Sequence, residues 1–154
     1  MIRGEMTDKQ YIAYLEDKVE FYRRDYNTGL LGRKDFECDM INLFYKEKNN
    51  FYLSMHDANG LHEVNRVQGW EAGDTLLREI ANQLKSKEVY QTYIIGGDEF
   101  MTVWFEDPKE IEIKNATGAY LYSGNFEDLK LMLRTLDVAV SEKKRLLKRR
   151  RDDI

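Results

Sequence analysis

Two runs of aromatic and β-branched residues around a pair of glycines place the strongest constraint on how this chain folds. The stretch reads YQTYIIGGDEFMTVWF and covers residues 90–105. Such runs favour strands and the glycines favour a turn, so we expect a β-hairpin from about Tyr90 to Glu106, ended by Pro108. Asp98 and Glu99 follow the glycines directly, although a hairpin does not need two acids where its second strand begins.

The rest of the chain predicts a mixture of strands and helices. FYLSMHD at residues 51–57 alternates like a strand, and it ends at Asp57, where the following loop begins. Residues 110–122 offer one or two more strands, with a turn near Asn115. Apolar residues at helical spacing predict helices over about 34–46, a short stretch within 58–70, 71–87 and about 126–149. This order predicts an α+β sandwich of the ferredoxin-like kind, with helices covering one mostly antiparallel sheet.

The same spacing predicts which side chains face the core. In chain order they are Phe36, Met40, Leu43, Phe44, Phe51, Leu53, Met55, Leu61, Val64, Val67, Leu76, Leu77, Ile80, Leu84, Leu129, Leu133, Leu136 and Val140.

The N-terminal residues 1–24 form a separate predicted helix ahead of a domain over 25–154. Its apolar residues are spaced by three and four positions, which predicts a coiled-coil-like seam of about two heptads. They are Ile12, Leu15, Val19, Tyr22 and Tyr26. The helix either packs on its own domain or serves as a dimerising stalk, and the spacing fits both interpretations.

Composition excludes several classes of protein. A formal charge of -4 argues against a dedicated DNA- or RNA-binding protein, although Lys143–Arg151 carries seven basic residues. Cys38 is the only cysteine, which excludes an internal disulfide and a CxxC metal site. No apolar run is long enough to span a membrane and the N-terminus lacks a signal-peptide pattern, so we expect a cytoplasmic protein of one domain.

Three acids could form one site if the strand that ends at Asp57 lies beside the second strand of the hairpin. Asp57, Asp98 and Glu99 would then meet at one edge of the sheet, where they would repel one another and raise their pKa values unless a cation neutralised them. Oxygen ligands without His or Cys favour Mg²⁺ or Mn²⁺, and two such ions can support phosphoryl or nucleotidyl transfer. Gly96 and Gly97 would let a triphosphate approach the turn closely. The plainer interpretation is that Asp98 and Glu99 are only polar turn residues.

Four blocks, in order along the chain, resemble the GGDEF family of diguanylate cyclases. GGDEF at 96–100 resembles the family signature, and DANGLHEVNRVQGWEAGD at 57–74 resembles a second motif without a gap. DYNTGLLGR at 25–33 and LDVAVSEKK at 136–144 resemble the opening and closing motifs, the last weakly. The resemblance implies a palm-like catalytic domain over 25–154 that condenses two GTP into cyclic di-GMP and releases pyrophosphate. It also implies a homodimer in which each domain holds one GTP.

The resemblance further implies roles for the acids. Asp57 and Asp98 would hold Mg²⁺ or Mn²⁺ with help from the Ala58 carbonyl. Glu99 would join the metal site or assist deprotonation of the attacking 3′-hydroxyl.

It also implies residues that bind the nucleotide. Asn65 and Asp74 would contact the guanine edge, because an Asp can accept from both the ring N–H and the exocyclic amine of guanine. Lys144 and Lys148, one helical turn apart, would meet the phosphates. His62 stands where a phosphate-contacting Lys is expected, and its alternative role is that of a surface helix residue.

Several positions depart from the family pattern. Asn59 replaces the second acid of D-x-D, Arg66 replaces an acid, and Trp70 replaces a His. Trp70 is expected to pack in the core, with the base pocket as its alternative place. Lys87 and Tyr90 occupy the positions of the R-x-x-D motif, so we expect no inhibitory product site of that kind.

The chain is also shorter than the family pattern between its last two strands. Only about ten residues, including Pro108, connect VWFED to ATGAYLY, where the family has an additional helix.

Two other functions stay open beside the diguanylate cyclase. A palm-type cyclase could make a different cyclic nucleotide from the same metal site. A degenerate domain could bind GTP or a cyclic nucleotide, or contact a partner, without turnover.

Overall fold

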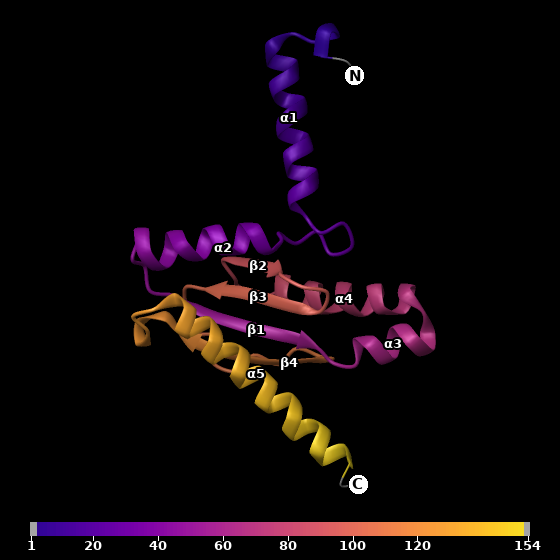
Figure 1. Ribbon diagram of the computed structural model, residues 1–154, viewed down its shortest axis with the longest axis vertical. Coiled ribbons are helices and arrows are strands. Elements are labelled where there is room, and N and C mark those ends of the chain that lie inside the picture. The colour runs from indigo at the N-terminus through magenta and orange to yellow at the C-terminus, as the bar shows by residue number, and fades with distance from the viewer. Residues whose placement is uncertain (1–2, 153–154) are drawn as a thin grey trace.

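The computed structural model describes residues 3–152, which form an N-terminal helix followed by a layered α+β domain (Figure 1). The elements in chain order are η1 (Arg3–Glu5), α1 (Asp8–Arg23), α2 (Arg33–Ile41), the π-helical turn η2 (Asn42–Lys46), β1 (Tyr52–Ala58), α3 (Leu61–Gln68), α4 (Trp70–Lys85), β2 (Gln91–Ile94), β3 (Glu99–Trp104), β4 (Ala116–Tyr122), η3 (Ser123–Asn125) and α5 (Leu129–Asp152). No helix among these described residues combines the length and the apolar character that crossing a membrane would need.

The sheet has the strand order β2-β3-β1-β4, and every neighbouring pair is antiparallel. β2 and β3 are the predicted hairpin, and β1 lies between β3 and β4. The register sets Asp57 opposite Glu99 on one side and opposite Thr117 on the other. The predicted α+β sandwich with an antiparallel sheet is therefore confirmed, and β1 and β3 are the neighbours that the acid cluster required.

Each face of the sheet has its own apolar core. Leu53 and Met55 of β1 pack in a cluster with residues of α2 and α5, whereas Ala58 and Phe100 pack in a second cluster with α4. Successive side chains of a strand point to opposite faces. Asp57 therefore follows Leu53 and Met55 on the α5 face, and His56 lies on the α4 face.

Helix α1 projects away from the sheet layers (Figure 1) and buries none of its residues. A capping box of Thr7 and Gln10 begins it. Its predicted seam residues are exposed, from 40% at Leu15 to 73% at Tyr22. The interpretation that this helix packs on its own domain is wrong. Tyr26 lies beyond the end of the helix, so the seam is shorter than predicted.

The hairpin of α3 and α4 corrects two predictions about the core. Trp70 is 76% exposed and Val67 is 63% exposed, so neither lies in the core. Gly69 between them adopts a φ of 91°, which breaks the helix and makes Trp70 the first residue of α4. Both side chains thus lie at the tip of the helical hairpin, where the sheet does not reach.

The C-terminal part follows the predictions with shifted boundaries. Within the predicted stretch 110–122, one strand forms, β4 (Ala116–Tyr122), and it begins after Asn115 with its φ of 66°. Helix α5 begins at Leu129, not at Phe126, and Asp128 just before it accepts at Oδ1 from the backbone N–H of Lys130 at 3.0 Å. Met132, which the apolar stripe had not included, is completely buried.

The connection between β3 and β4 contains no helix, as its length predicted. Its end is fixed to α4 by Gln83, whose side chain accepts from the backbone N–H of Lys114 at 2.7 Å and donates to the Lys114 carbonyl at 3.1 Å. The α4 face of β1 and β4 is consequently covered by a short, irregular segment.

Candidate metal and nucleotide site

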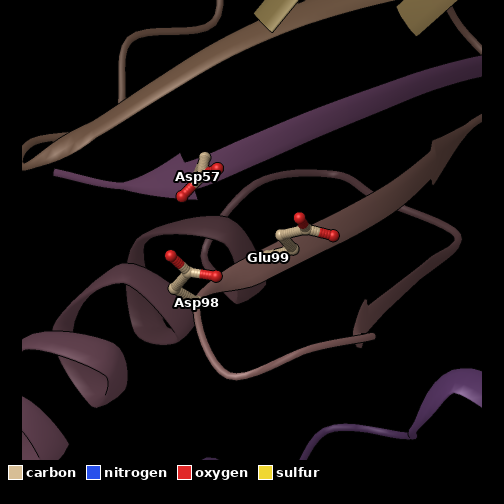
Figure 2. A group of neighbouring side chains, drawn as sticks. All are labelled: Asp57, Asp98 and Glu99. Carbon is tan, nitrogen blue, oxygen red and sulfur yellow. The ribbon is translucent and has the colours of Figure 1, made fainter. Parts of the chain in front are cut away.

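Three carboxylates meet where β1 ends and β3 begins. Asp57, Asp98 and Glu99 each offer one oxygen, and these oxygens lie within 4.8 Å of one another (Figure 2). Strand pairing holds them together, because Glu99 is the partner of Asp57 in the ladder. The backbone N–H of Ala58 donates to the Asp98 carbonyl at 2.9 Å and fixes the turn beside the strand. The structure therefore brings together the three acids that the sequence had placed on separate elements.

The electrostatics of this cluster disfavour three bare negative charges. Burial raises the pKa of the Asp57 carboxyl above its ordinary value, Lys144 opposes that rise, and the charge of Asp98 adds to it. Burial also raises the pKa of Glu99, and the charges of Asp57 and Asp98 raise it further. A divalent cation would remove this repulsion. An all-oxygen donor set is one that suits Mg²⁺ or Mn²⁺, so the residues fit the predicted metal.

Lys144 of α5 reaches this cluster across the face of the sheet. Its ammonium lies 2.9 Å from Asp57 Oδ1 and donates to the Ala58 carbonyl at 3.2 Å. It thus contacts two of the groups to which the resemblance assigned a metal. The ammonium and a metal ion would compete for the same oxygens. The predicted contact of Lys144 with phosphate stays a prediction.

The glycines of the turn are not required by the backbone. Neither Gly96 nor Gly97 has a positive φ. A Cβ at Gly97 would meet nothing within 4 Å, and one at Gly96 would come no closer than 3.8 Å to the Glu99 side chain. The fold would accept larger residues at both positions, so the open space over the turn is available to a ligand.

Asn65 on α3 and Asp74 on α4 lie on the facing helices of one hairpin. Asn65 Oδ1 is buried without a hydrogen-bond partner among the described residues. A Cβ at Gly73 would lie 1.7 Å from that oxygen, so only glycine lets the two helices approach here. Asn27, in the loop between α1 and α2, donates from Nδ2 to the Asp74 carbonyl at 3.0 Å. This bond joins the loop after α1 to the proposed base site.

The remaining predicted substrate residues are on the surface. His62 on α3 and Lys148 on α5 are both exposed. Their predicted contacts with phosphate depend on the resemblance alone. His56 was not predicted as a site residue at all. Only its place beside Asp57 in an apolar strand could have drawn attention to it.

The family model described as the GGDEF domain of diguanylate cyclases matches residues 23–121. An uncharacterized membrane protein of Staphylococcus saprophyticus is 31% identical over 96 residues, which are 59% of this chain and 26% of that protein. The chain thus spans about a quarter of the length of this curated relative.

Solved structures share the fold. The coiled coil and GGDEF domain of DgcB from Caulobacter crescentus in complex with c-di-GMP aligns with a TM-score of 0.76 at 15% identity, covering 89% of this chain and 88% of that one. The GGDEF domain of DgcB alone covers 80% of this chain, with a TM-score of 0.66 at 17% identity. The diguanylate cyclase SiaD from Pseudomonas aeruginosa, in complex with its activator SiaC, has a TM-score of 0.66 at 20% identity and covers 89% of this chain and 64% of that one. The family match covers more than half of the residues, and the chain therefore belongs to the GGDEF family of diguanylate cyclase domains.

Proposed function

We propose that this chain condenses two molecules of GTP into cyclic di-GMP, releases two pyrophosphates, and depends on Mg²⁺ or Mn²⁺. The observation that carries the proposal is the cluster of Asp57, Asp98 and Glu99, whose oxygens lie within 4.8 Å of one another. A binding scaffold has no need for three acids that repel one another at one end of a strand. A metal-dependent nucleotidyl transferase does need them.

The three acids have two roles in this proposal: Asp57 and Asp98 bind the metal, and Glu99 accepts a proton from the attacking hydroxyl. Divalent ions would lower the pKa of an attacking hydroxyl and stabilise the leaving oxygen. Asp57, Asp98 and the Ala58 carbonyl would hold them. Glu99 has a raised pKa, which suits its carboxylate to accept the proton of the attacking 3′-hydroxyl. Lys144 would leave the Asp57 carboxylate and meet the negative charge of the transferred phosphate.

Guanine would be selected between α3 and α4. The Asp74 carboxylate can accept from the ring N–H and the exocyclic amine of guanine, and adenine lacks this pair of donors. Asn65 contributes a side-chain amide whose buried oxygen has no partner within the described chain. Asn27 holds the backbone of Asp74 in place. These three residues together favour GTP over ATP.

The reaction needs two nucleotides that face each other, and we assign this to a homodimer. Each subunit would present one GTP to the other. The exposed apolar side of α1 supports this assignment, because the residues of its seam have no cover in the described chain. The greater coverage of this chain by the form of DgcB that includes its coiled coil also supports it. Helix α1 would then be the dimerising stalk.

The direct test is mass spectrometry of the products formed from mixed nucleotides. The purified chain is incubated with ATP, GTP, CTP and UTP together, once with Mg²⁺ and once with Mn²⁺. We expect cyclic di-GMP and consumption of GTP alone, and a far lower yield of product from Asp98→Asn. Intact GTP at high protein concentration would contradict the proposal, and a different cyclic nucleotide would move it to the palm-type cyclase with another product.

A second candidate is a module that binds nucleotide without turnover. It is favoured by Lys144, whose contacts with Asp57 and the Ala58 carbonyl compete with a metal ion. A thermal shift that requires both GTP and metal, is lost in Asp98→Asn, and occurs without any product would support this candidate.

A further inference from the structure

A cavity lies beside the edge strand β4, on the face of β1 opposite to the acid cluster. Its volume is about 630 Å³, and a smaller hollow of about 310 Å³ adjoins it. The two share His56, Gly118 and Lys143 in their walls. They lie where the irregular connection between β3 and β4 takes the place of a helix. None of the three clustered acids lines either hollow, so this is a separate place in the molecule.

His56 forms the buried wall of the cavity. Its side chain is 1% exposed, and neither ring nitrogen has a hydrogen-bond partner among residues 3–152. Gly118 on β4 is its partner in the ladder. A Cβ at Gly118 would lie 2.2 Å from Cδ2 and 2.4 Å from Nε2 of the ring, so the imidazole fits only because glycine stands opposite. A buried polar group without a partner is destabilising, and a ligand that forms a hydrogen bond with the imidazole would relieve this.

The charges around the cavity are mainly positive. Lys143 lines both hollows, and its ammonium donates to the Gly118 carbonyl at 2.7 Å. Lys114 and Arg150 also line the larger hollow, in which Glu112 is the acid. This excess of cations contrasts with the net charge of -4 for the whole chain. The cavity therefore attracts an anion.

The other walls are apolar and held in place. Ile111, Ile113, Leu146 and Leu147 supply the apolar surface. The segment that carries the first two is fixed to α4 by the paired bonds between Gln83 and Lys114. A volume of this size accepts a small organic molecule, and such sites typically combine apolar walls with a few polar groups.

We propose that this cavity binds a small organic anion with a flat apolar body, whose charged group lies among Lys143, Lys114 and Arg150 and whose polar edge meets His56. The body of the ligand lies against the isoleucine and leucine side chains. The site does not depend on turnover of GTP. Its occupation and the chemistry at the acid cluster can be measured separately.

The test uses anilinonaphthalene sulfonate, a flat apolar anion, as the probe. It is titrated into the full chain without nucleotide or metal, and binding is followed by fluorescence and by the imidazole resonances in long-range proton–nitrogen correlation spectra. The chain has two histidines, His56 and the exposed His62, so His62 is an internal reference. We expect saturable binding of one probe per chain, with a shift of the His56 resonances and none at His62.

Charge reversal separates the site from unspecific binding. The double variant Lys114→Glu and Arg150→Glu changes exposed side chains, and we expect it to weaken binding about tenfold. Arg149→Glu on the same helix is the matched control, because Arg149 does not line the cavity. The uncharged phenylnaphthylamine should bind more weakly than the sulfonate.

Two results would overturn the proposal. One is a rise in fluorescence without any movement of the His56 resonances. The other is an equal affinity of the probe for the double variant, the Arg149→Glu control and the unchanged chain.

Discussion

Two consecutive residues of β1, His56 and Asp57, lie on opposite faces of the sheet and have very different surroundings. Asp57 faces α5, lies among other acids and contacts the ammonium of Lys144. His56 faces the opposite side and is buried beside Gly118, and burial lowers its pKa to about 4. On the α5 face, the clustered carboxylates repel one another, and a bound cation would stabilise them. On the α4 face, burial keeps the His56 imidazole neutral at pH 7, and neither of its ring nitrogens has a hydrogen-bond partner among the described residues.

The largest expected effect is on the acid side of this comparison. Asp98→Asn keeps the shape of the side chain but removes a negative ligand, so the site loses several kcal/mol of metal stabilisation and turnover falls on the order of a thousandfold. Initial rates of cyclic di-GMP formation measure this, with circular dichroism to confirm that the variant folds. A variant that keeps more than a tenth of the rate would show that the acid cluster is not the catalytic centre.

The next largest effect is expected in the pH dependence of protein stability, to which His56 contributes. His56 has a lower pKa in the folded protein, about 4, than the usual 6.5, so the unfolded chain binds more protons between these values. Stability is therefore full above about pH 6.5 and decreases as the pH falls toward 4, by roughly 3 kcal/mol in total. Urea unfolding at several pH values measures this in the unchanged chain and in His56→Leu.

The loss of stability with falling pH should be smaller in His56→Leu by about 3 kcal/mol. His62→Gln, on exposed α3, is the matched control and should keep the original profile. Equal stability–pH profiles in all three proteins would mean that folding does not lower the pKa of His56. The contrast between the two faces of β1 would then be wrong.

A smaller change is expected in the choice of nucleotide. Asp74→Ser removes the carboxylate that would accept two hydrogen bonds from guanine, which is worth about 1–3 kcal/mol of discrimination. The preference for GTP over ATP should fall by about tenfold or more, as measured by competition for binding. Asp137→Ser on α5 is a control outside the base site. Unchanged selectivity in Asp74→Ser would move guanine recognition elsewhere.

The smallest effect concerns the repulsion within the acid cluster. The pKa of Glu99 is raised by burial and then by the charges of Asp57 and Asp98, so its ionised form disfavours folding near neutral pH and this cost disappears as the pH falls through the raised pKa. Glu99→Gln should therefore stabilise the metal-free protein near neutral pH by up to about 1 kcal/mol.

Thermal unfolding in the presence of a chelator measures this small gain. Glu127→Gln, an exposed residue before α5, serves as the control and should have no effect. Destabilisation of the metal-free protein by Glu99→Gln would show that Glu99 is held by favourable contacts and not opposed by its neighbours.

The sequence contained enough information to predict the acid side of β1. Alternation fixed the strand that ends at Asp57, and the glycine pair fixed the hairpin that presents Asp98 and Glu99. Both signals are local, because they depend on the pleat and on turn chemistry. Only the adjacency of β1 and β3 had to be assumed, and the register of the sheet confirms it.

The other features depend on contacts between distant segments. Trp70 and Val67 are apolar, yet they lie at the tip of a helical hairpin that extends past the sheet. The spacing of the α1 seam is the same whether the helix packs on its domain or on a partner. The contact of Lys144 with Asp57 joins residues far apart in the sequence. The burial of His56 depends on Gly118 in another strand, which cannot be deduced from the local pattern of β1.

Binding of Mn²⁺, followed by electron paramagnetic resonance, tests the central claim most directly, because it detects the metal site without requiring turnover. The unchanged chain should bind Mn²⁺ saturably in the presence of GTP. Asp57→Asn and Asp98→Asn should each weaken that binding by at least about tenfold, whereas Asp17→Asn, on the exposed helix α1, should not. Equal Mn²⁺ affinity in all four proteins would contradict the account, because the acids that meet at the end of β1 would then not be the metal site.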